Sequence, residues 1–279
     1  MNNPIPSSTP HDALTTDTDG TLNPSHIHQP WSALRQFTDA RIALGRAGQS
    51  LPTNAHLQFQ WAHAQARDAV HIPLDVASIA QPLQAMGIET LALHSAAPDR
   101  RSYLQRPDWG RKLDEASGAT LQRWRAQHAD AAQPDVCIVV ADGLSPLAIH
   151  SNALAFIQLL LERLQNDTPT WKVAPVCVVQ QGRVAIGDDI GEQLAAKLVI
   201  VLIGERPGLS SPDSMGLYMT WAPHVGCTDA QRNCISNVRS AGLALKDAAF
   251  KLHGLMRQAH TLQLTGVGLK DDAPSFLSE

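Results

Sequence analysis

The chain has 279 residues, with 22 basic and 26 acidic side chains and a net charge of −4. This length allows one large or two modest domains with a real hydrophobic core. Because Lys and Arg form no basic stripe, we expect no nucleic-acid partner. No apolar run reaches the ~18 residues of a membrane span and no signal sequence is evident, so we expect an intracellular, reduced protein without a membrane partner.

The N-terminal part of the chain divides into two predicted regions. Residues 1–30 are rich in Pro, Ser, Thr, Asp and His. Such a segment buries too little apolar surface to offset its ordering entropy, so we predict a disordered tail. Residues 31–132 form a predicted, mainly helical domain, because their apolar side chains recur at helical spacing. Within that domain, residues 88–93 could be a short strand or an extended stretch.

The pattern changes in residues 133–279, where three apolar, β-branched runs alternate with two helical segments. The predicted strands are 136–141, 173–180 and 198–203, and the predicted helices are 146–164 and 191–197. This alternation is typical of a mostly parallel sheet with helices on both faces. We therefore predict an α/β protein with a Rossmann-like C-terminal domain and a smaller helical N-terminal domain.

Shorter features complete the predicted domain. We expect residues 182–187 to be extended, and Asp188 or Asp189 to cap the helix that follows them. Residues 218–222 favour a strand, and the polar run 227–237 is expected to be a loop. An amphipathic helix is predicted over 241–260.

Two carboxylates follow predicted buried strands, at the edge where open α/β sheets bind ligands. Asp142 follows the first strand and Glu205 the third. Paired carboxylates can act as general acid and base, so a stand-alone α/β enzyme that uses Asp142 and Glu205 is one hypothesis. A non-catalytic scaffold protein is another. Glu205 and Arg206 could also form only a solvated turn, with a salt bridge between them. The chain has no Gly-x-Ser-x-Gly, Walker A or His-Glu-x-x-His motif.

The cysteines near the C-terminal end allow two further interpretations. His224, Cys227 and Cys234 could supply three zinc ligands, but a fourth is missing and the spacing fits no standard zinc site. Cys234 could instead be a nucleophile, with Arg232 nearby to favour its thiolate, although no His partner is evident. The amides and hydroxyls around Cys234 could also bind a large polar ligand or simply hold a long loop in place.

Several motifs resemble the small subunit of ethanolamine ammonia-lyase. They are found at residues 41–48, 64–70, 106–108, 139–145, 204–209 and 233–237. These motifs occur in the family's order between about residues 40 and 255. The resemblance implies an adenosylcobalamin-dependent enzyme that converts ethanolamine to acetaldehyde and ammonia. It also implies a helical N-terminal part and a Rossmann-like C-terminal part.

The resemblance further implies which molecules this chain contacts. In that family a large TIM-barrel subunit binds ethanolamine, and six large and six small subunits form a heterododecamer. The small subunit shares the cobalamin, and its cofactor contacts correspond to Val184, Glu205 and Cys234. No catalytic residue and no metal ligand is assigned to this chain. Packaging in a bacterial microcompartment is expected, with the free cytoplasm as the alternative.

These three residue types suit cobalamin, which is a large ring rimmed with amides. The Glu205 carboxylate can accept hydrogen bonds, Val184 can offer backbone groups and apolar surface, and Cys234 is small enough to allow close approach. The cofactor performs the chemistry in such enzymes, while the protein binds and orients it. The alternative for Val184 and Cys234 is that they only pack the fold.

Overall fold

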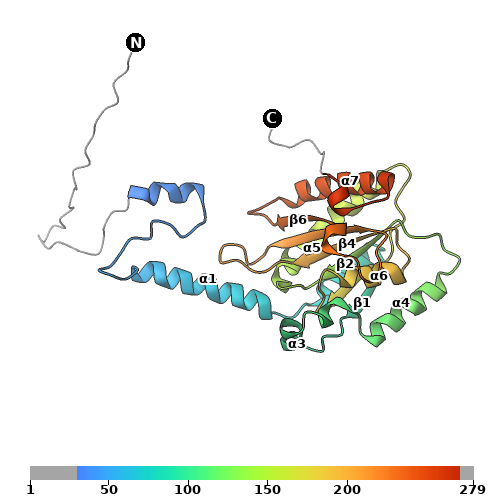
Figure 1. Ribbon diagram of the computed structural model, residues 1–279, viewed down its shortest axis with the longest axis horizontal. Coiled ribbons are helices and arrows are strands. Elements are labelled where there is room, and N and C mark those ends of the chain that lie inside the picture. Colours follow the sequence, from blue (N-terminus) through green and yellow to red (C-terminus); the bar gives the residue numbers. More distant parts are fainter. Residues whose placement is uncertain (1–29, 271–279) are drawn as a thin grey trace, which may run out of the picture. The chain divides into compact units, whose positions relative to one another are not determined.

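The computed structural model describes residues 30–270 (Figure 1). Except for Pro30, the predicted tail of residues 1–30 lies outside the described residues. The chain forms two compact units that divide between Ala62 and His63. The described part of the first unit contains the 3-10 helix η1 (Pro30–Phe37) and the beginning of helix α1 (Thr53–His71).

The second unit is a mixed α/β structure built on one six-stranded sheet, with the strand order β1-β3-β2-β4-β5-β6. The strands are β1 (Thr90–His94), β2 (Val136–Ala141), β3 (Val176–Gln180), β4 (Leu198–Gly204), β5 (Met215–Trp221) and β6 (Arg232–Val238). The pairs β1–β3, β3–β2 and β2–β4 are parallel, whereas β5 is antiparallel to both of its neighbours. Residues 88–93 thus contain a strand, which was one of the two predicted alternatives.

Helices cover both faces of the sheet (Figure 1). They are α2 (Val76–Ala85), α3 (Arg100–Gln105), α4 (Glu115–Gln127), α5 (Pro146–Gln165), α6 (Ile186–Gln193) and α7 (Leu245–Leu262), with the 3-10 turns η2 (Trp109–Arg111), η3 (Asp229–Gln231) and η4 (Gly266–Gly268). Helices α2, α5 and α7 pack on one face. Helices α4 and α6 pack on the other, which we call the α6 face. No helix within residues 30–270 is long and apolar enough to cross a membrane.

The central strands explain the apolar runs in the sequence. Every residue of β2 and β4 is buried. A strand covered by helices on both faces needs apolar side chains at every position rather than at alternate positions. Ser145 caps α5, because its hydroxyl accepts a hydrogen bond from the Ala148 N–H at 3.1 Å and Pro146 begins the helix.

Two local predictions are wrong. Residues 232–238 form strand β6 instead of part of a polar loop. An edge strand with one open face tolerates polar side chains, so its composition does not distinguish it from a loop. Helix α6 begins at Ile186, so residues 182–187 are not all extended and the helix predicted at 191–197 is shifted. Asp188 and Asp189 lie in its first turn, where the helix dipole also favours carboxylates, rather than at its cap.

The carboxyl end of β4 packs closely against the loop after β2. A Cβ atom on Gly204 would lie 2.1 Å from the Ser145 carbonyl oxygen and 2.6 Å from that of Asp142. The Gly204 carbonyl accepts a hydrogen bond from the Leu144 N–H at 2.9 Å. Glycine at this position therefore lets two neighbouring strand ends meet without a side chain between them.

Asp142, directly after β2, is hydrogen-bonded to the residues that follow β3 at the same edge of the sheet. It is 1% exposed, and it accepts hydrogen bonds from the Gln181 and Gly182 N–H groups, both at 2.9 Å, and from Arg100 Nη1 at 3.3 Å. The chain leaves β2 for α5 on one face and leaves β3 for α6 on the other. Burial raises the pKa of Asp142 to about 6, although Arg100 and the backbone N–H groups oppose the rise.

A buried ion pair ties β6 to α6. Arg232 donates through Nη1 and Nη2 to the two carboxylate oxygens of Asp188, at 2.5 and 2.7 Å. It also donates to Thr220 Oγ1 at 3.1 Å and to the Cys227 carbonyl at 2.9 Å. Both charged side chains are 3% exposed. Burial raises the pKa of Asp188, and the hydrogen bonds from Arg232 oppose that rise.

Hydrogen bonds join the beginning of β6 to the segment after α7. The Asn233 side-chain oxygen accepts a hydrogen bond from the Gly266 N–H at 2.7 Å, and its amide donates to the Leu269 carbonyl at 3.1 Å. Thr265 Oγ1 donates to the Gln231 carbonyl at 2.7 Å, just before the strand begins. These contacts hold η4 beside the strand.

We expect the stability advantage of the wild type over Asp142→Asn to shrink as the pH rises. The carboxyl pKa is about 6 in the fold and ~3.9 in an unfolded chain, so the folded state binds more protons between about pH 4 and pH 6. This group therefore lowers the free energy of unfolding of the wild type across that window, by up to roughly 3 kcal/mol. Urea unfolding of both proteins at about pH 4 and pH 7 measures the difference. An advantage that grows with pH would contradict the assignment.

Arg232→Ala should lower the free energy of unfolding by about 3–5 kcal/mol, because it leaves the Asp188 carboxylate buried and unpaired. Removing both charges with Arg232→Met and Asp188→Asn should restore most of that loss. Arg67→Ala is the control, since Arg67 is 66% exposed and its pair with Asp68 is long, at 3.7 Å. Urea unfolding compares the variants. A double variant as unstable as the single one would show that the charge of Asp188 is not the cause.

Candidate functional site

Glu205 lies directly after β4, and its side chain turns over the beginning of β5. Its carboxylate accepts hydrogen bonds from Ser214 Oγ at 2.5 Å, Ser236 Oγ at 2.5 Å and the Asn237 N–H at 3.2 Å. A Cβ atom on Gly216 would lie 3.0 Å from Glu205 Oε1, so glycine leaves room for the carboxylate. A carboxylate has about four acceptor positions. These three bonds therefore hold Glu205 in place and leave it able to accept another.

Cys234 and Tyr218 lie next to each other on the α6 face. The two residues are directly opposite in the β5–β6 ladder, and Tyr218 packs against the hydrophobic cluster of that face. Burial raises the pKa of Tyr218, and the neighbouring Cys234 and Glu205 raise it further. The three side chains are thus close enough to influence one another.

The surroundings of Cys234 do not favour a nucleophile. Burial raises the pKa of its thiol and the charge of Glu205 adds to the rise, while a hydrogen bond with Tyr218 opposes it. Arg232, which was expected to favour the thiolate, is bound by Asp188 instead. A reactive cysteine needs a lowered pKa. The structure therefore presents Cys234 as an exposed, neutral thiol.

Val184 lies in the turn between β3 and α6. It is half-buried and packs against the same hydrophobic cluster as Tyr218. The turn is fixed by hydrogen bonds from the Ile186 N–H to the Arg183 carbonyl and from the Gly187 N–H to the Val184 carbonyl, at 2.9 and 3.1 Å. Val184 therefore offers an apolar side chain at the carboxyl edge of the sheet.

The structure brings all three predicted cofactor residues to the α6 side of the sheet. Glu205 and Cys234 both lie near Tyr218. Val184 follows β3, which is near the opposite side of the sheet from β6. Four strand spacings separate β3 from β6, which corresponds to roughly 19 Å. Helix α6 packs on β2 and β4 and α4 packs on β1, but Cys234 and Ser236 of β6 are exposed. The result is a wide, partly open face.

Asp142 and Glu205 do not form an acid–base pair. Asp142 is bound toward β3, through Gln181, Gly182 and Arg100. Glu205 is bound toward β5 and β6, through Ser214 and Ser236. The two carboxylates share no hydrogen-bond partner in residues 30–270, so the geometry does not aim them at one reacting group.

The suggested zinc ligands are only partly together. Cys227 Sγ lies 3.3 Å from His224 Nδ1, whereas Cys234 is on β6 beside Tyr218. Across the described range 30–270, no group of three or more His, Cys, Asp or Glu side chains is placed to hold a metal ion.

The sequence did not reveal a cluster of charged side chains above β1 and β3. The Tyr103 ring stacks with two arginines, and its centre lies 4.7 Å from the guanidinium carbon of Arg100 and 4.4 Å from that of Arg183. Its hydroxyl donates to the Gly182 carbonyl at 3.1 Å. The only available signal was the position of Arg183 next to Val184, and an arginine in a turn is ordinarily a surface residue.

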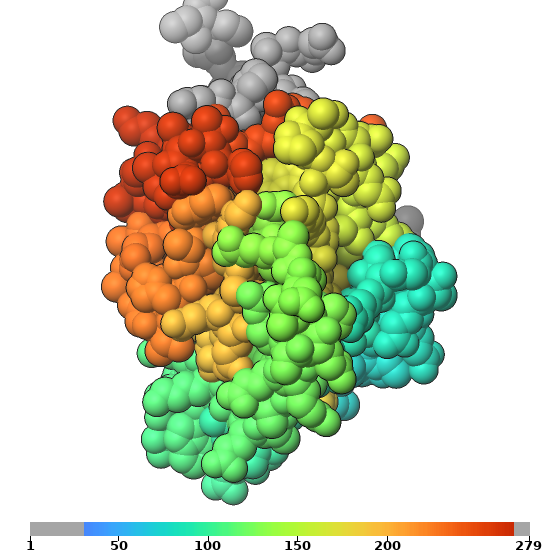
Figure 2. Space-filling view, turned by 90° about the vertical axis from the view of Figure 1, so that its right-hand side faces the viewer, coloured from blue at the N-terminus to red at the C-terminus, as the bar shows by residue number. Residues whose placement is uncertain are grey.

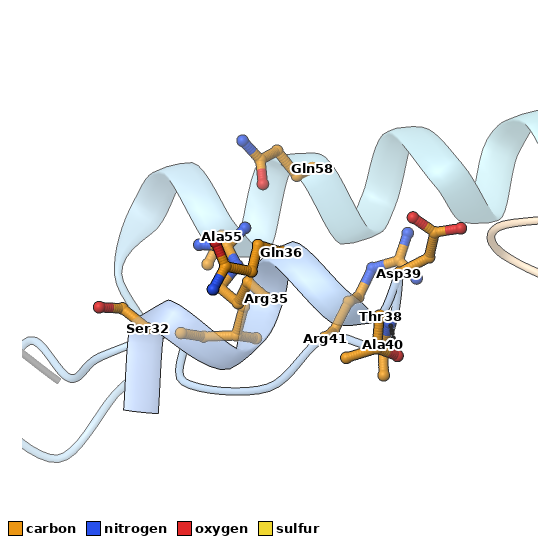
Figure 3. A pocket seen from close by; sticks show the side chains of 10 residues that line it. Ser32, Arg35, Gln36, Thr38, Asp39, Ala40, Arg41, Ala55 and Gln58 are labelled. Carbon is orange, nitrogen blue, oxygen red and sulfur yellow. Dashed lines mark hydrogen bonds between the residues drawn. The ribbon is translucent and has the colours of Figure 1, made fainter. Parts of the chain in front are cut away.

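Two cavities are lined by other residues. One of 540 Å³ is formed within the first unit, where Arg35, Gln36 and Arg41 are among the residues that line it (Figure 3). Another of 390 Å³ lies at the amino ends of β1 and β3, between Trp124 and Trp171. Figure 2 shows the side of the molecule where α4, in green, passes beside the segment before β3, in yellow. Neither cavity is lined by the predicted cofactor residues.

Comparisons with known proteins agree with the motifs. The family model described as "Ethanolamine ammonia-lyase light chain (EutC)" matches residues 28–270. A protein of Pseudomonas fluorescens (strain Pf0-1) named "Ethanolamine ammonia-lyase small subunit" is 58% identical over 250 residues, which cover 90% of each chain. One of the same name from Azotobacter vinelandii (strain DJ / ATCC BAA-1303) is 57% identical over 244 residues, covering 88% of this chain and 89% of its own. The chain belongs to the ethanolamine ammonia-lyase light-chain (EutC) family.

Proposed function

We propose that this chain is the small subunit of an ethanolamine ammonia-lyase and helps to bind adenosylcobalamin on the α6 face of its sheet. The enzyme deaminates ethanolamine to acetaldehyde and ammonia. One observation carries the cofactor assignment: Glu205, Tyr218 and Cys234 meet on a part of the sheet where the β6 side chains are exposed. Parallel strands with helices on both faces support a Rossmann-like class for the sheet.

The groups on this face fit a large cofactor rimmed with amides. Adenosylcobalamin, when bound, supplies the radical that starts the deamination. Glu205 is held by three hydrogen bonds and can accept another from an amide or hydroxyl group. Cys234 has a small, neutral side chain, and Val184 and Tyr218 provide apolar surface. In this role the chain binds and orients the cofactor, and none of these residues has to act as an acid or base.

We propose the large subunit as the partner that completes the site. The name of the two relatives, which calls each a "small subunit", supports a large-subunit partner. A face that is spread over roughly 19 Å and is not an enclosed cavity needs a second surface to bury a ligand. The large subunit would bind ethanolamine, and the complete enzyme would be a heterododecamer.

We also propose that the enzyme is packaged in a bacterial microcompartment, with the free cytoplasm as the alternative location. This proposal follows from the family alone. Detection of the chain in purified microcompartments, after a wash that removes adsorbed protein, would support it. Recovery only in the soluble fraction of the same cells would favour the alternative.

The chain alone should not deaminate ethanolamine, because the proposed substrate site is on the partner. Mixed with the large subunit and adenosylcobalamin, it should produce acetaldehyde, which a coupled alcohol dehydrogenase assay measures. Activity of the chain alone, or a mixture that neither binds cobalamin nor consumes ethanolamine, would overturn the proposal. The large subunit tested alone with the cofactor is the control.

Glu205→Ala should weaken adenosylcobalamin binding by the assembled enzyme about tenfold to hundredfold, as expected for the loss of a hydrogen bond to a charged group. A spectroscopic titration of the cofactor measures the affinity. Glu162→Gln is a matched control, because it removes an exposed carboxylate from α5, on the opposite face. Subunit assembly and urea unfolding show whether the variant remains folded. Unchanged affinity in a folded Glu205→Ala variant would remove Glu205 from the site.

A further inference from the structure

We infer that Arg183 forms a binding site for a phosphate group, and that its ligand is the phosphodiester in the nucleotide tail of the cofactor. The identity of the ligand rests on the proposed function. The chemistry of the site rests on how the fold holds this one side chain at the carboxyl edge of β3, the edge at which open α/β sheets bind ligands.

The guanidinium of Arg183 is held in place before any ligand binds. It stacks on the Tyr103 ring at 4.4 Å, and Nη2 donates to the Tyr103 carbonyl at 3.2 Å. The Arg183 backbone N–H donates to the Gly110 carbonyl at 2.7 Å. A Cβ atom on Gly110 would lie 2.7 Å from Arg183 Cγ, so glycine leaves the space that the side chain occupies. A side chain held in this way loses little conformational entropy when a ligand binds.

Most donors of this guanidinium have no partner. An arginine side chain has five N–H donors, and within residues 30–270 Arg183 makes one side-chain hydrogen bond, to Tyr103. Its Nε is buried without an acceptor. No carboxylate of the described chain forms an ion pair with it. A guanidinium that is half-buried yet lacks a counter-ion is typical of a site whose acceptor comes from a ligand.

The neighbouring charges leave this positive charge unbalanced. Arg100 shares the Tyr103 ring but is paired with Asp142, at 3.3 Å. Burial lowers the pKa of Arg100, Asp142 opposes that change, and the nearby charge of Arg183 lowers it further. The one carboxylate of this cluster is therefore bound to Arg100, and an anion next to Arg183 would balance the second positive charge.

Phosphate is the anion that best fits this group. A planar guanidinium can bind phosphate through two parallel hydrogen bonds, and the free Nη1 and Nη2 donors are suited to this geometry. The phosphodiester is the negatively charged group of cobalamin's nucleotide tail, whereas the corrin rim carries neutral amides. Arg183 lies next to Val184 and about four strand spacings, roughly 19 Å, from β6. A ligand with a ring and a long tail can contact both ends of that span.

The test compares two cofactors in the assembled enzyme of this chain and the large subunit. Adenosylcobalamin contains the nucleotide tail, and adenosylcobinamide lacks its phosphate, ribose and base. Affinities of the wild type, Arg183→Gln and Arg183→Lys for both are measured by spectroscopic titration. Arg183→Gln should bind adenosylcobalamin about tenfold to hundredfold more weakly than the wild type does. Its affinity for adenosylcobinamide should stay within about twofold of the wild-type value. Arg183→Lys keeps the positive charge but loses the planar, two-pronged guanidinium. Its affinity for adenosylcobalamin should therefore lie between those of the wild type and Arg183→Gln.

Arg101→Gln is the matched control, because it removes an exposed arginine from the same region, on α3. It should leave both affinities unchanged. If Arg183→Gln lowers the affinities for both cofactors equally, the residue only shapes the turn that carries Val184. Unchanged affinities for both cofactors would also overturn the inference. If inorganic phosphate raises the melting temperature of the wild type but not of Arg183→Gln, while the cofactors are unaffected, the site binds free phosphate and the inference about the tail is wrong. A wild-type enzyme that binds neither cofactor would instead reject the proposed function.

Discussion

The bidentate pair between Arg232 and Asp188 fixes the geometry of the candidate site. Asp188 is in the first turn of α6, close behind Val184, and Arg232 begins β6, two residues before Cys234. One interaction therefore sets the separation of two elements that carry proposed ligand contacts. Removing two charges from water is costly, so such a pair is weak evidence of extra stability. The ion pair instead fixes the position of β6, because the exposed polar side chains of this strand bury little apolar surface that could hold it in place.

Glu205 and Asp142 show how similar positions acquire different roles. Both follow buried parallel strands at the same edge of the sheet. Asp142 is enclosed by donors that follow the neighbouring strand β3 and by Arg100, so its role is to hold the ends of β2 and β3 together. Glu205 is bound by hydroxyl and backbone groups of β5 and β6 but remains only half-buried. A carboxylate that is oriented by its own protein is prepared to receive a ligand without further rearrangement.

The sequence predicted the parts of the fold that depend on local pattern. The buried strands β2 and β4 were clear because burial on both faces requires unbroken apolar runs. Strand β6 was missed because its polar side chains are stabilised by contacts with distant segments, such as Asp188 and Gly266. The family motifs identified Val184, Glu205 and Cys234, and their roles as cofactor contacts stay predictions. The stacking of Arg183 on Tyr103 joins residues 80 positions apart, and no local pattern contains that information.

The contacts between η4 and the beginning of β6 have a consequence for how the protein is made. An uncovered edge strand offers unpaired N–H and C=O groups to other chains and is a common origin of aggregation. Here η4 is bound by Asn233 near the beginning of the edge strand β6, and it follows all six strands in the chain. During synthesis the sheet can form before η4 has left the ribosome. In this interval β6 lacks the hydrogen bonds that anchor its beginning, so the newly made edge strand is less firmly held and more open to association with other chains until α7 and η4 have docked.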